Sequence, residues 1–249
     1  MTKPGYKTLF DKTMDVYWLE QTEADVPAEN DWLHASEAVR LNGLRFAKRR
    51  ADWRLGRWTA KRAVAVSLNL PLDRQALAGI EIRPAPSGAP EVFLANAPAD
   101  ATISLSHREG TAVCAVVLGR AALGCDLEMI EQHTDAFVAD YFTIEEQDLV
   151  AHAPAADRLR LLALLWSAKE STLKALQEGL RLDTRSVIVS PVDYYDGCTD
   201  AWHRLRVSGA NGQVFHGWWC HTGDLLRTMV AAPPPVAPIL LKIATAALV

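Results

Sequence analysis

The 249-residue sequence has few cysteines, and none of its four forms a Cys-x-x-Cys pair. Such scattered cysteines are typical of reduced thiols and argue against a disulfide framework or a zinc site. No run of about 18 or more apolar residues occurs, so no membrane span is expected. Residues Met1–Phe10 lack the apolar core of a signal peptide, and we therefore expect a cytoplasmic location.

Several fingerprints of nucleotide-binding proteins and hydrolases are also absent. The chain has no Gly-rich phosphate loop, no dinucleotide-binding glycine pattern and no Gly-x-Ser-x-Gly elbow. Its net charge of −4 argues against a general nucleic-acid binder. What the sequence does have is 49% hydrophobic residues, enough for a sizeable core.

The pattern of apolar residues predicts a mixture of helices and strands. A long helix is expected over Ser36–Ser67, with Asn42-Gly43 as a break near its start, and a second over Arg158–Gln177, stopped by Gly179. A shorter helix, Thr143–His152, begins with a capping box. Strands are expected at Val16–Leu19, Ile80–Arg83, Thr102–Ser106, Thr111–Leu118, Leu123–Ile130 and over Ser186–Val230, where Asp196-Gly197 and Asn211-Gly212 predict hairpins.

These elements suggest two similar α+β halves, each with a long helix packed on a small sheet, and a cleft between them. No short repeat is found, and the similarity is not visible as sequence identity. The proline-rich segment Ala231–Pro238 is expected to leave the fold. The apolar tail after it, Ile239–Val249, is expected either to pack loosely on the body or to be mobile.

Two carboxylates share one face of the strand that begins at Leu123. Leu123, Cys125 and Leu127 alternate with Gly124, Asp126 and Glu128, so the acids point to the same side about 7 Å apart along the backbone. Carboxylate oxygens suit Mg²⁺, which keeps several waters and needs only two or three protein ligands. The competing interpretation is a wet acidic face on an edge strand.

Charged residues also interrupt the most apolar helix. Trp166, Glu170 and Lys174 recur every four residues and share one face. A surface Glu170–Lys174 ion pair is one interpretation. On a largely buried helix, charges otherwise need partners or a function, and a metal ion with a phosphate would supply both.

A basic stripe follows the first long helix, formed by Arg50, Arg54, Arg57 and Lys61. It suits phosphate binding or, alternatively, a solvated face. The strand that contains Ser104 and Ser106 ends at His107, and such hydroxyls and imidazoles can hold a phosphate. An isolated histidine in a turn is the alternative.

In combination these segments resemble the 4'-phosphopantetheinyl transferase superfamily, and its long, surfactin-synthetase-activating type. The two signature segments are a Gly-x-Asp-x-Glu strand and, some forty residues later, Trp-x-x-Lys-Glu-x-x-x-Lys. The stretches that carry the resemblance are Gly56–Lys61, Gly88–Pro90, Ser104–His107, Gly124–Glu128 and Trp166–Lys174.

The resemblance implies a pseudo-twofold α+β fold with coenzyme A (CoA) between the halves. We expect residues 1–121 to form the N-terminal half, 122–232 the C-terminal half with the metal site, and 233–249 the tail. Many relatives have Gly-Lys-Pro where this chain has Gly88-Ala89-Pro90, so a phosphate-contacting lysine is missing. Arg83 or Arg108 is a candidate substitute.

By resemblance, Asp126, Glu128 and Glu170 bind Mg²⁺, with Mn²⁺ as an alternative ion, and Lys174 contacts the phosphate under attack. Residues implied to hold the rest of CoA are Arg50, Arg57, Lys61, Ser106 and His107. Glu146, in a Tyr-Phe-Thr-x-x-Glu stretch, is implied to be a further acid near the metal and is grouped with Glu170 and Lys174 as catalytic.

The activity implied is transfer of phosphopantetheine from CoA to a serine of an apo acyl or peptidyl carrier protein by a cytoplasmic monomer. Two alternatives remain open: a Mg²⁺-dependent hydrolase of CoA or nucleotides, and a non-catalytic module that binds CoA or a carrier. No nucleic-acid or membrane partner is expected.

Overall fold

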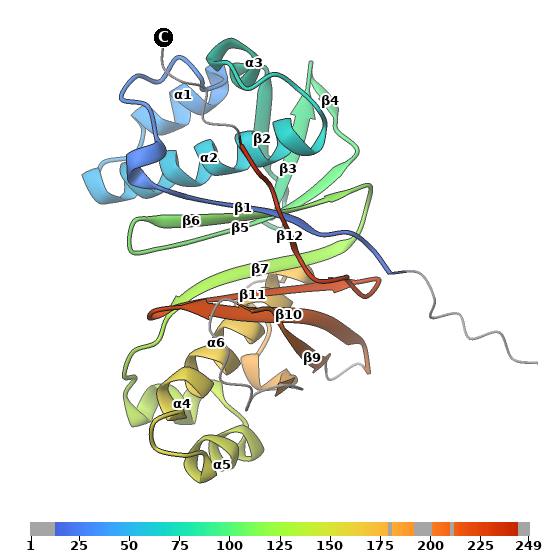
Figure 1. The fold of residues 1–249 in the computed structure, drawn as a ribbon. Helices are drawn as coiled ribbons and strands as arrows, with labels where there is room; N and C mark the ends of the chain where they lie inside the picture. The colour runs from blue at the N-terminus through green and yellow to red at the C-terminus, as the bar shows by residue number, and fades with distance from the viewer. Residues whose placement is uncertain (1–12, 179–180, 192–200, 210–211, 244–249) are drawn as a thin grey trace, which may run out of the picture.

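The computed structural model describes residues 13–178, 181–191, 201–209 and 212–243. Two sheets lie face to face in its middle, and a long helix covers the outer side of each: α2 (Ala47–Ser67) and α6 (Arg158–Ala175) (Figure 1). The α+β class is therefore confirmed. The layers run helix, sheet, sheet, helix.

The first sheet has the strand order β12-β1-β6-β5, and only the β1–β12 pair is parallel. The second is antiparallel, in the order β7-β11-β10-β9-β8. The bounds are β1 (Tyr17–Thr22), β5 (Ala101–Arg108), β6 (Thr111–Leu118), β7 (Ala122–Met129), β8 (Val187–Pro191), β9 (His203–Gly209), β10 (Val214–Thr222), β11 (Leu225–Ala232) and β12 (Ile239–Leu240).

A third sheet and several short helices complete the two ends of the molecule. The small sheet, in the order β2-β3-β4, lies beside α2. Its β3 and β4, like α3 and α4, had no counterpart among the expected elements. The bounds are α1 (Ala35–Asn42), α3 (Arg74–Ala78), α4 (Asp135–Tyr141), α5 (Ile144–His152), β2 (Ile80–Pro84), β3 (Pro90–Leu94) and β4 (Ala97–Pro98).

The long helices differ in their ends from the prediction. The helix expected over Ser36–Ser67 is broken after Gly43, the C-cap of α1, and resumes at Ala47. The second long helix ends at Ala175, and Gln177 takes the left-handed conformation with φ of 59°. Gly179, the expected stop, lies outside the described residues.

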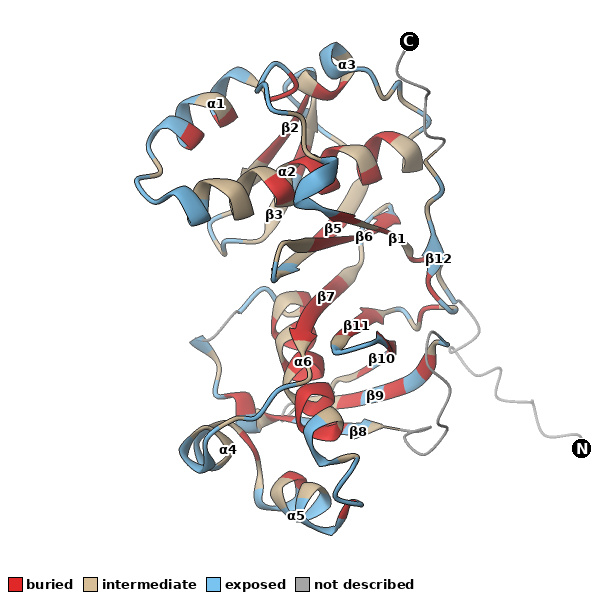
Figure 2. Cartoon of the chain, turned by 60° about the vertical axis from the view of Figure 1, so that its left-hand side comes forward, coloured by how far each residue is buried: buried red, intermediate tan, exposed pale blue. Residues whose placement is uncertain are grey.

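Buried and exposed positions alternate along β9 (Figure 2), and the buried residues of the described chain form three core clusters. One lies under α2 and another under α6. The third fills the space between the two sheets and contains Leu123, Cys125 and Leu127 of β7. The opposite face of β7 must therefore point toward α6, which directs Asp126 and Glu128 to that side.

Each half is tied together by a buried lysine–glutamate pair. Lys61 Nζ on α2 lies 2.5 Å from Glu37 and donates to the carbonyls of Trp32 and Leu77. Glu37 also accepts from the amide of Ile82 on β2. One buried ion pair thus joins a short helix, the long helix and a strand.

The second half repeats this arrangement. Lys169 Nζ on α6 lies 2.8 Å from Glu146 and donates to the carbonyls of Thr184 and Val187. Glu146 likewise accepts from the amide of Val189 on β8. Both glutamates occupy the third position of a short helix in a capping box. The pseudo-twofold relation stays a prediction, and these matched contacts support it.

The matched lysines reveal a sequence similarity between the halves, contrary to the expectation that none is visible. Lys61 ends Trp58-Thr59-Ala60-Lys61, and Lys169 ends Trp166-Ser167-Ala168-Lys169. Four residues are too few to stand out by sequence alone, because the flanking helix positions differ in charge and size.

The C-terminal segment stays in the fold, so the prediction that Ala231–Pro238 departs is wrong. Ala231 and Ala232 still pair with β7, and Met14 donates its amide to Pro234. Strand β12 then joins the first sheet beside β1, and Leu241 packs on the core under α2. The described part of the tail thus packs on the body, and residues 244–249 lie outside the described ranges.

Other expectations from the sequence are met where the structure describes them. Cys114 and Cys125 are free thiols in the core, and Cys220 is also buried. Cys198 and the Asp196-Gly197 turn lie outside the described residues. Strands β9 and β10 pair antiparallel around the predicted Asn211-Gly212 turn, although Asn211 itself is not described. No described helix is long and apolar enough to cross a membrane.

Candidate functional site

Strands β5 and β7 belong to different sheets, and hydroxyl side chains of β5 connect them. Thr102, Ser104 and Ser106 alternate along β5 and so point to one side. Thr102 and Ser104 accept hydrogen bonds from the amides of Ala121 and Cys125. Ser106 Oγ donates to Asp126 Oδ1 over 2.8 Å. The acidic end of β7 is thereby fixed against β5.

Asp126 is the central acid of this region, and the residue is only 5% exposed. Lys174 Nζ lies 2.7 Å from the same Oδ1 atom that Ser106 contacts, and it also donates to the carbonyl of Cys125. Asp126 Oδ2 is buried and has no hydrogen-bond partner. A buried, unpaired carboxylate oxygen carries a large desolvation cost, which a cation would offset.

The stripe predicted on α6 faces β7. From Leu161 to Ala175, the residues that are not buried are Trp166, Glu170 and Lys174. Gly124 allows this close approach, since a Cβ built on it would lie 1.7 Å from the carbonyl oxygen of Ser171. The glycine of the strand motif and the helix motif therefore meet directly, and Lys174 reaches Asp126.

The other two acids are held at raised pKa values. Burial raises the pKa of Glu170, and repulsion by Asp126 and Glu128 adds to this rise. Burial also raises the pKa of Glu128, although the hydrogen bond from the amide of Met129 and the positive charge of Arg108 act to lower it. Only 8% of Glu128 is exposed, which excludes the alternative of a wet acidic face.

The lysine of the cluster keeps its charge. Burial opposes the ammonium of Lys174, but attraction by Asp126 and Glu170 prevails and raises its pKa. The surface Glu170–Lys174 pair considered from the sequence is thus replaced by a buried contact with Asp126. A cation so held is suited to an anionic ligand that enters the cluster.

The three acids predicted to bind the metal lie near one another, but their carboxylates do not converge on a single metal position. Among the residues that the structure describes, no three His, Cys, Asp or Glu side chains are arranged to hold a metal ion. Lys174 contacts Asp126 and Arg108 contacts Glu128. The donor chemistry nevertheless fits Mg²⁺, because the side chains offer carboxylate oxygens and Asp126 Oδ2 lacks a partner.

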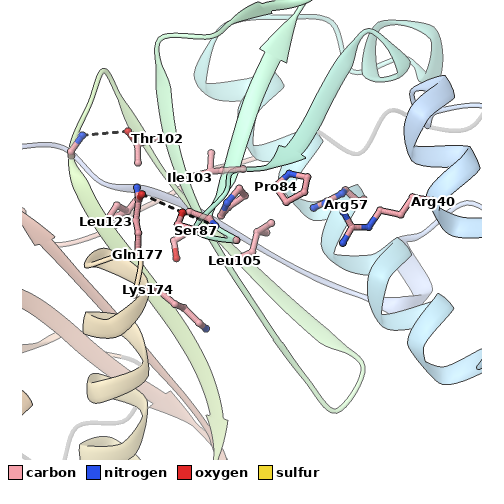
Figure 3. Close-up of a pocket in the computed structure, with 15 residues that line it drawn as sticks. Arg40, Arg57, Pro84, Ser87, Thr102, Ile103, Leu105, Leu123, Lys174 and Gln177 are labelled. Atoms are coloured by element: carbon pink, nitrogen blue, oxygen red, sulfur yellow. Dashed lines mark hydrogen bonds between the residues drawn. The ribbon is translucent and has the colours of Figure 1, made fainter. Parts of the chain in front are cut away.

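A cavity of about 390 Å³ opens beside this cluster. Figure 3 shows Lys174 and Gln177 on one side of it and Arg40 and Arg57 on the other. Its floor includes β5 and the start of β7, and the loop Ser87–Pro90 closes one edge. Lys174 belongs to both the cavity and the acid cluster, so the two form one continuous site.

Arg57 makes this cavity attractive to anions. Its Nε is buried without a hydrogen-bond partner, and its nearest acid, Glu37, is 3.6 Å away. Burial lowers the pKa of Arg57, yet an arginine stays charged. Of the two candidates for the missing lysine, Arg83 contacts Glu81, and Arg108 contacts Glu128 and Glu131. The cations that line the cavity together with Ala89 are Arg40, Arg57 and Lys174.

Two predicted site residues are not at this site. Lys61 is fully buried, and its ammonium pairs with Glu37 and donates hydrogen bonds to two backbone carbonyls. Glu146 faces Lys169 and the amides of Thr143 and Val189. The predictions that Lys61 binds CoA and that Glu146 is an acid near the metal are therefore wrong, since both side chains hold the fold together.

The remaining predicted residues lie around the cleft. His107 is exposed at the end of β5, within electrostatic range of Lys174 and of Lys48 and Asp52 on α2. Arg50 is partly exposed in the first turn of α2 and does not line the cavity. Ser106 contacts Asp126. Sequence reasoning missed the lining role of Gln177 and the hydroxyl alternation at Thr102, Ser104 and Ser106, which is a readable signal.

The arginine-lined cavity lies beside the carboxylate cluster, and its cations are suited to an anionic ligand such as a phosphate. Residues 122–208 match the model of the 4'-phosphopantetheinyl transferase superfamily.

One curated relative is the 4'-phosphopantetheinyl transferase HetI of Nostoc sp. (strain PCC 7120), 24% identical over 198 residues, which are 78% of this chain and 81% of HetI. Among solved structures, a holo-(acyl-carrier-protein) synthase from Bacillus anthracis in complex with CoA (3',5'-ADP) is 21% identical. It matches 42% of this chain and 95% of its own, with a TM-score of 0.36. The Helicobacter pylori holo-[acyl-carrier-protein] synthase in complex with coenzyme A is 18% identical over 42% and 99%, with a TM-score of 0.34.

Proposed function

We propose that this protein is a phosphopantetheinyl transferase of the long type, which moves phosphopantetheine from CoA to a serine of an apo carrier protein. The observation that carries the proposal is that Lys174 joins the acid cluster to the arginine-lined cavity. CoA has a phosphate at its nucleotide end and a diphosphate in its middle, so it needs cations at two places. Arg40 and Arg57 lie at one place and Lys174 at the other.

The reaction follows from these positions. The carrier serine oxygen attacks the β-phosphate of CoA, a new P–O bond forms, and the P–O bond to 3',5'-ADP breaks. Lys174 stabilises the charge that builds up on the phosphate oxygens. The serine proton passes to Glu170, directly or through a water that Glu170 holds.

We further propose that Asp126, Glu128 and Glu170 hold a Mg²⁺ ion, for which Mn²⁺ can substitute. When bound, the ion would neutralise charge on the diphosphate. We also propose that the protein acts as a cytoplasmic monomer, because one chain supplies both the cavity and the acid cluster, with Lys174 common to the two. We propose that its partners are CoA and carriers rather than nucleic acid or membrane. The division at residues 121 and 232 likewise remains a proposal.

The test is incubation of the protein with CoA, Mg²⁺ and a panel of apo carrier proteins, followed by intact-protein mass spectrometry. We expect a gain of one phosphopantetheine on the carrier serine, which EDTA abolishes. Glu170→Gln should lower the rate by a factor of about 10²–10⁴, the usual contribution of general acid–base catalysis. The matched control is Glu178→Gln, an exposed carboxylate close to the same helix, which should keep the wild-type rate.

Three results would change the proposal. CoA cleavage without a carrier would indicate the hydrolase, and tight CoA binding without transfer to any carrier would indicate a binding module. Full activity of a well-folded Glu170→Gln variant would refute the site assignment.

A further inference from the structure

The hydroxyl of Ser106 lies outside the cavity and next to the acid cluster. The cavity lining follows β5 from Thr102 to Leu105 and does not include Ser106. The side chain instead donates to Asp126 Oδ1 over 2.8 Å. Ser106 is therefore placed to act on Asp126 rather than on a ligand in the cavity.

The two donors on Asp126 fix the plane of its carboxylate. Ser106 approaches from β5 and Lys174 from α6, and both contact the same oxygen. A partial rotation of the carboxylate would lengthen both contacts, and a half turn would only place the equivalent oxygen in the same position. The other oxygen, Oδ2, is left buried without a partner. The two hydrogen bonds to Oδ1 therefore leave Oδ2 available for another ligand.

We propose that Ser106 is a positioning residue that holds Asp126 so that Oδ2 remains available to a divalent cation. This inference rests on the proposed function, since it assigns a purpose to the metal site proposed there. Lys174 alone does not suffice for this role, because its ammonium also serves the cavity and its long side chain is flexible. Residues that orient metal ligands typically change metal affinity 10- to 100-fold when they are replaced.

The experiment measures Mn²⁺ binding by the electron paramagnetic resonance signal of the free ion, with the full-length protein and saturating CoA. CoA without protein gives the background. We expect Ser106→Ala to weaken Mn²⁺ binding by about 10- to 100-fold and Ser106→Thr, which keeps a hydroxyl, to bind within a few-fold of wild type. Thr184→Ala is the control: it removes a hydroxyl that donates to the carbonyl of Tyr141 and that belongs neither to the cavity lining nor to the acid cluster, so it should lower thermal stability and keep the Mn²⁺ affinity.

A second ligand distinguishes this role from direct contact with CoA. With 3'-dephospho-CoA in place of CoA, Ser106→Ala should lose the same factor in Mn²⁺ affinity, and its affinity for CoA without metal should equal that of the wild type. If the loss disappears with 3'-dephospho-CoA, Ser106 contacts the 3'-phosphate and the inference is overturned.

The variant Asp126→Asn distinguishes a failure of the role inferred for Ser106 from a failure of the proposed metal site. Loss of Mn²⁺ binding in Asp126→Asn with wild-type binding in Ser106→Ala refutes only the role of Ser106. Wild-type Mn²⁺ binding in Asp126→Asn, or no binding by the wild type at all, refutes the proposed metal site as well.

Discussion

Replacing Gly124 by alanine should separate the two motifs that form the site. The added Cβ would lie 1.7 Å from the Ser171 carbonyl oxygen and 2.9 Å from the amide nitrogen of Ala175. Unstrained contacts are at ~3.5–4 Å, so α6 and β7 must move apart by roughly 2 Å. The obstructing atoms are backbone of a buried helix and cannot rotate away.

Overpacking of this kind costs about 1–3 kcal/mol, and we expect the upper end here because no side chain can yield. For a chain of this length, 3 kcal/mol lowers the melting temperature by roughly 6–12 °C. The separation also moves Lys174 and Glu170 away from Asp126. A misplacement of ~1 Å can lower turnover about 100-fold, so activity should fall even in the folded fraction.

The assay is thermal melting by circular dichroism, together with the carrier-modification rate well below the melting temperature. Gly56→Ala is the matched control for stability, because nothing lies within 4 Å of its added Cβ. In the interior of α2 this change should stabilise by about 0.5–1 kcal/mol. A Gly124→Ala protein with wild-type melting and wild-type turnover would refute the close contact between β7 and α6.

Two further predictions concern buried charges. Lys169→Met leaves Glu146 buried without its cation, which should lower the free energy of unfolding in urea by about 3–5 kcal/mol. Adding Glu146→Leu to this variant should restore most of the lost stability. If the double variant shows no recovery, the two residues do not act as a pair. The second prediction concerns Glu170, whose pKa is raised in the folded protein. Without metal, the folded protein therefore binds a proton at Glu170 more readily than the unfolded chain does. The stability that this proton contributes is lost as the pH rises through the raised pKa. Glu170→Gln cannot titrate, so its melting temperature relative to wild type should climb from pH 5 to pH 8; a constant difference would show that Glu170 has an ordinary pKa.

Local patterns in the sequence determined much of the fold. The capping box at Thr143 and Glu146, the break at Gly43 and the alternation along β7 appear in the structure as predicted. These features depend on hydrogen bonds and side-chain directions within a few residues, so the chain specifies them without distant partners. The Gly-x-Asp-x-Glu and Trp-x-x-Lys-Glu motifs likewise located Asp126, Glu170 and Lys174, because each motif is a local spacing.

The partners of charged residues were decided by the tertiary structure. Glu146 and Lys61 matched a family segment and a basic stripe, yet each pairs with a residue more than twenty positions away in the sequence. Lys169 and Glu170 are adjacent in sequence but point to different sides of α6, one into the core and one toward β7. Burial decides whether such a residue has a structural role or is available to a ligand. A charge in the core needs a partner within the protein, whereas a charge at the rim of a cavity can bind a ligand.

What the sequence by itself determined is therefore the set of chemical groups, the strand and helix that carry them, and the family that they resemble. Only the folded chain decided that Gly124 brings α6 against β7, that Ser106 and Lys174 share one oxygen of Asp126, and that Arg40 and Arg57 meet across a cavity from Lys174. These contacts join segments far apart in the sequence, and their geometry depends on how two sheets and two helices pack, which no local pattern encodes.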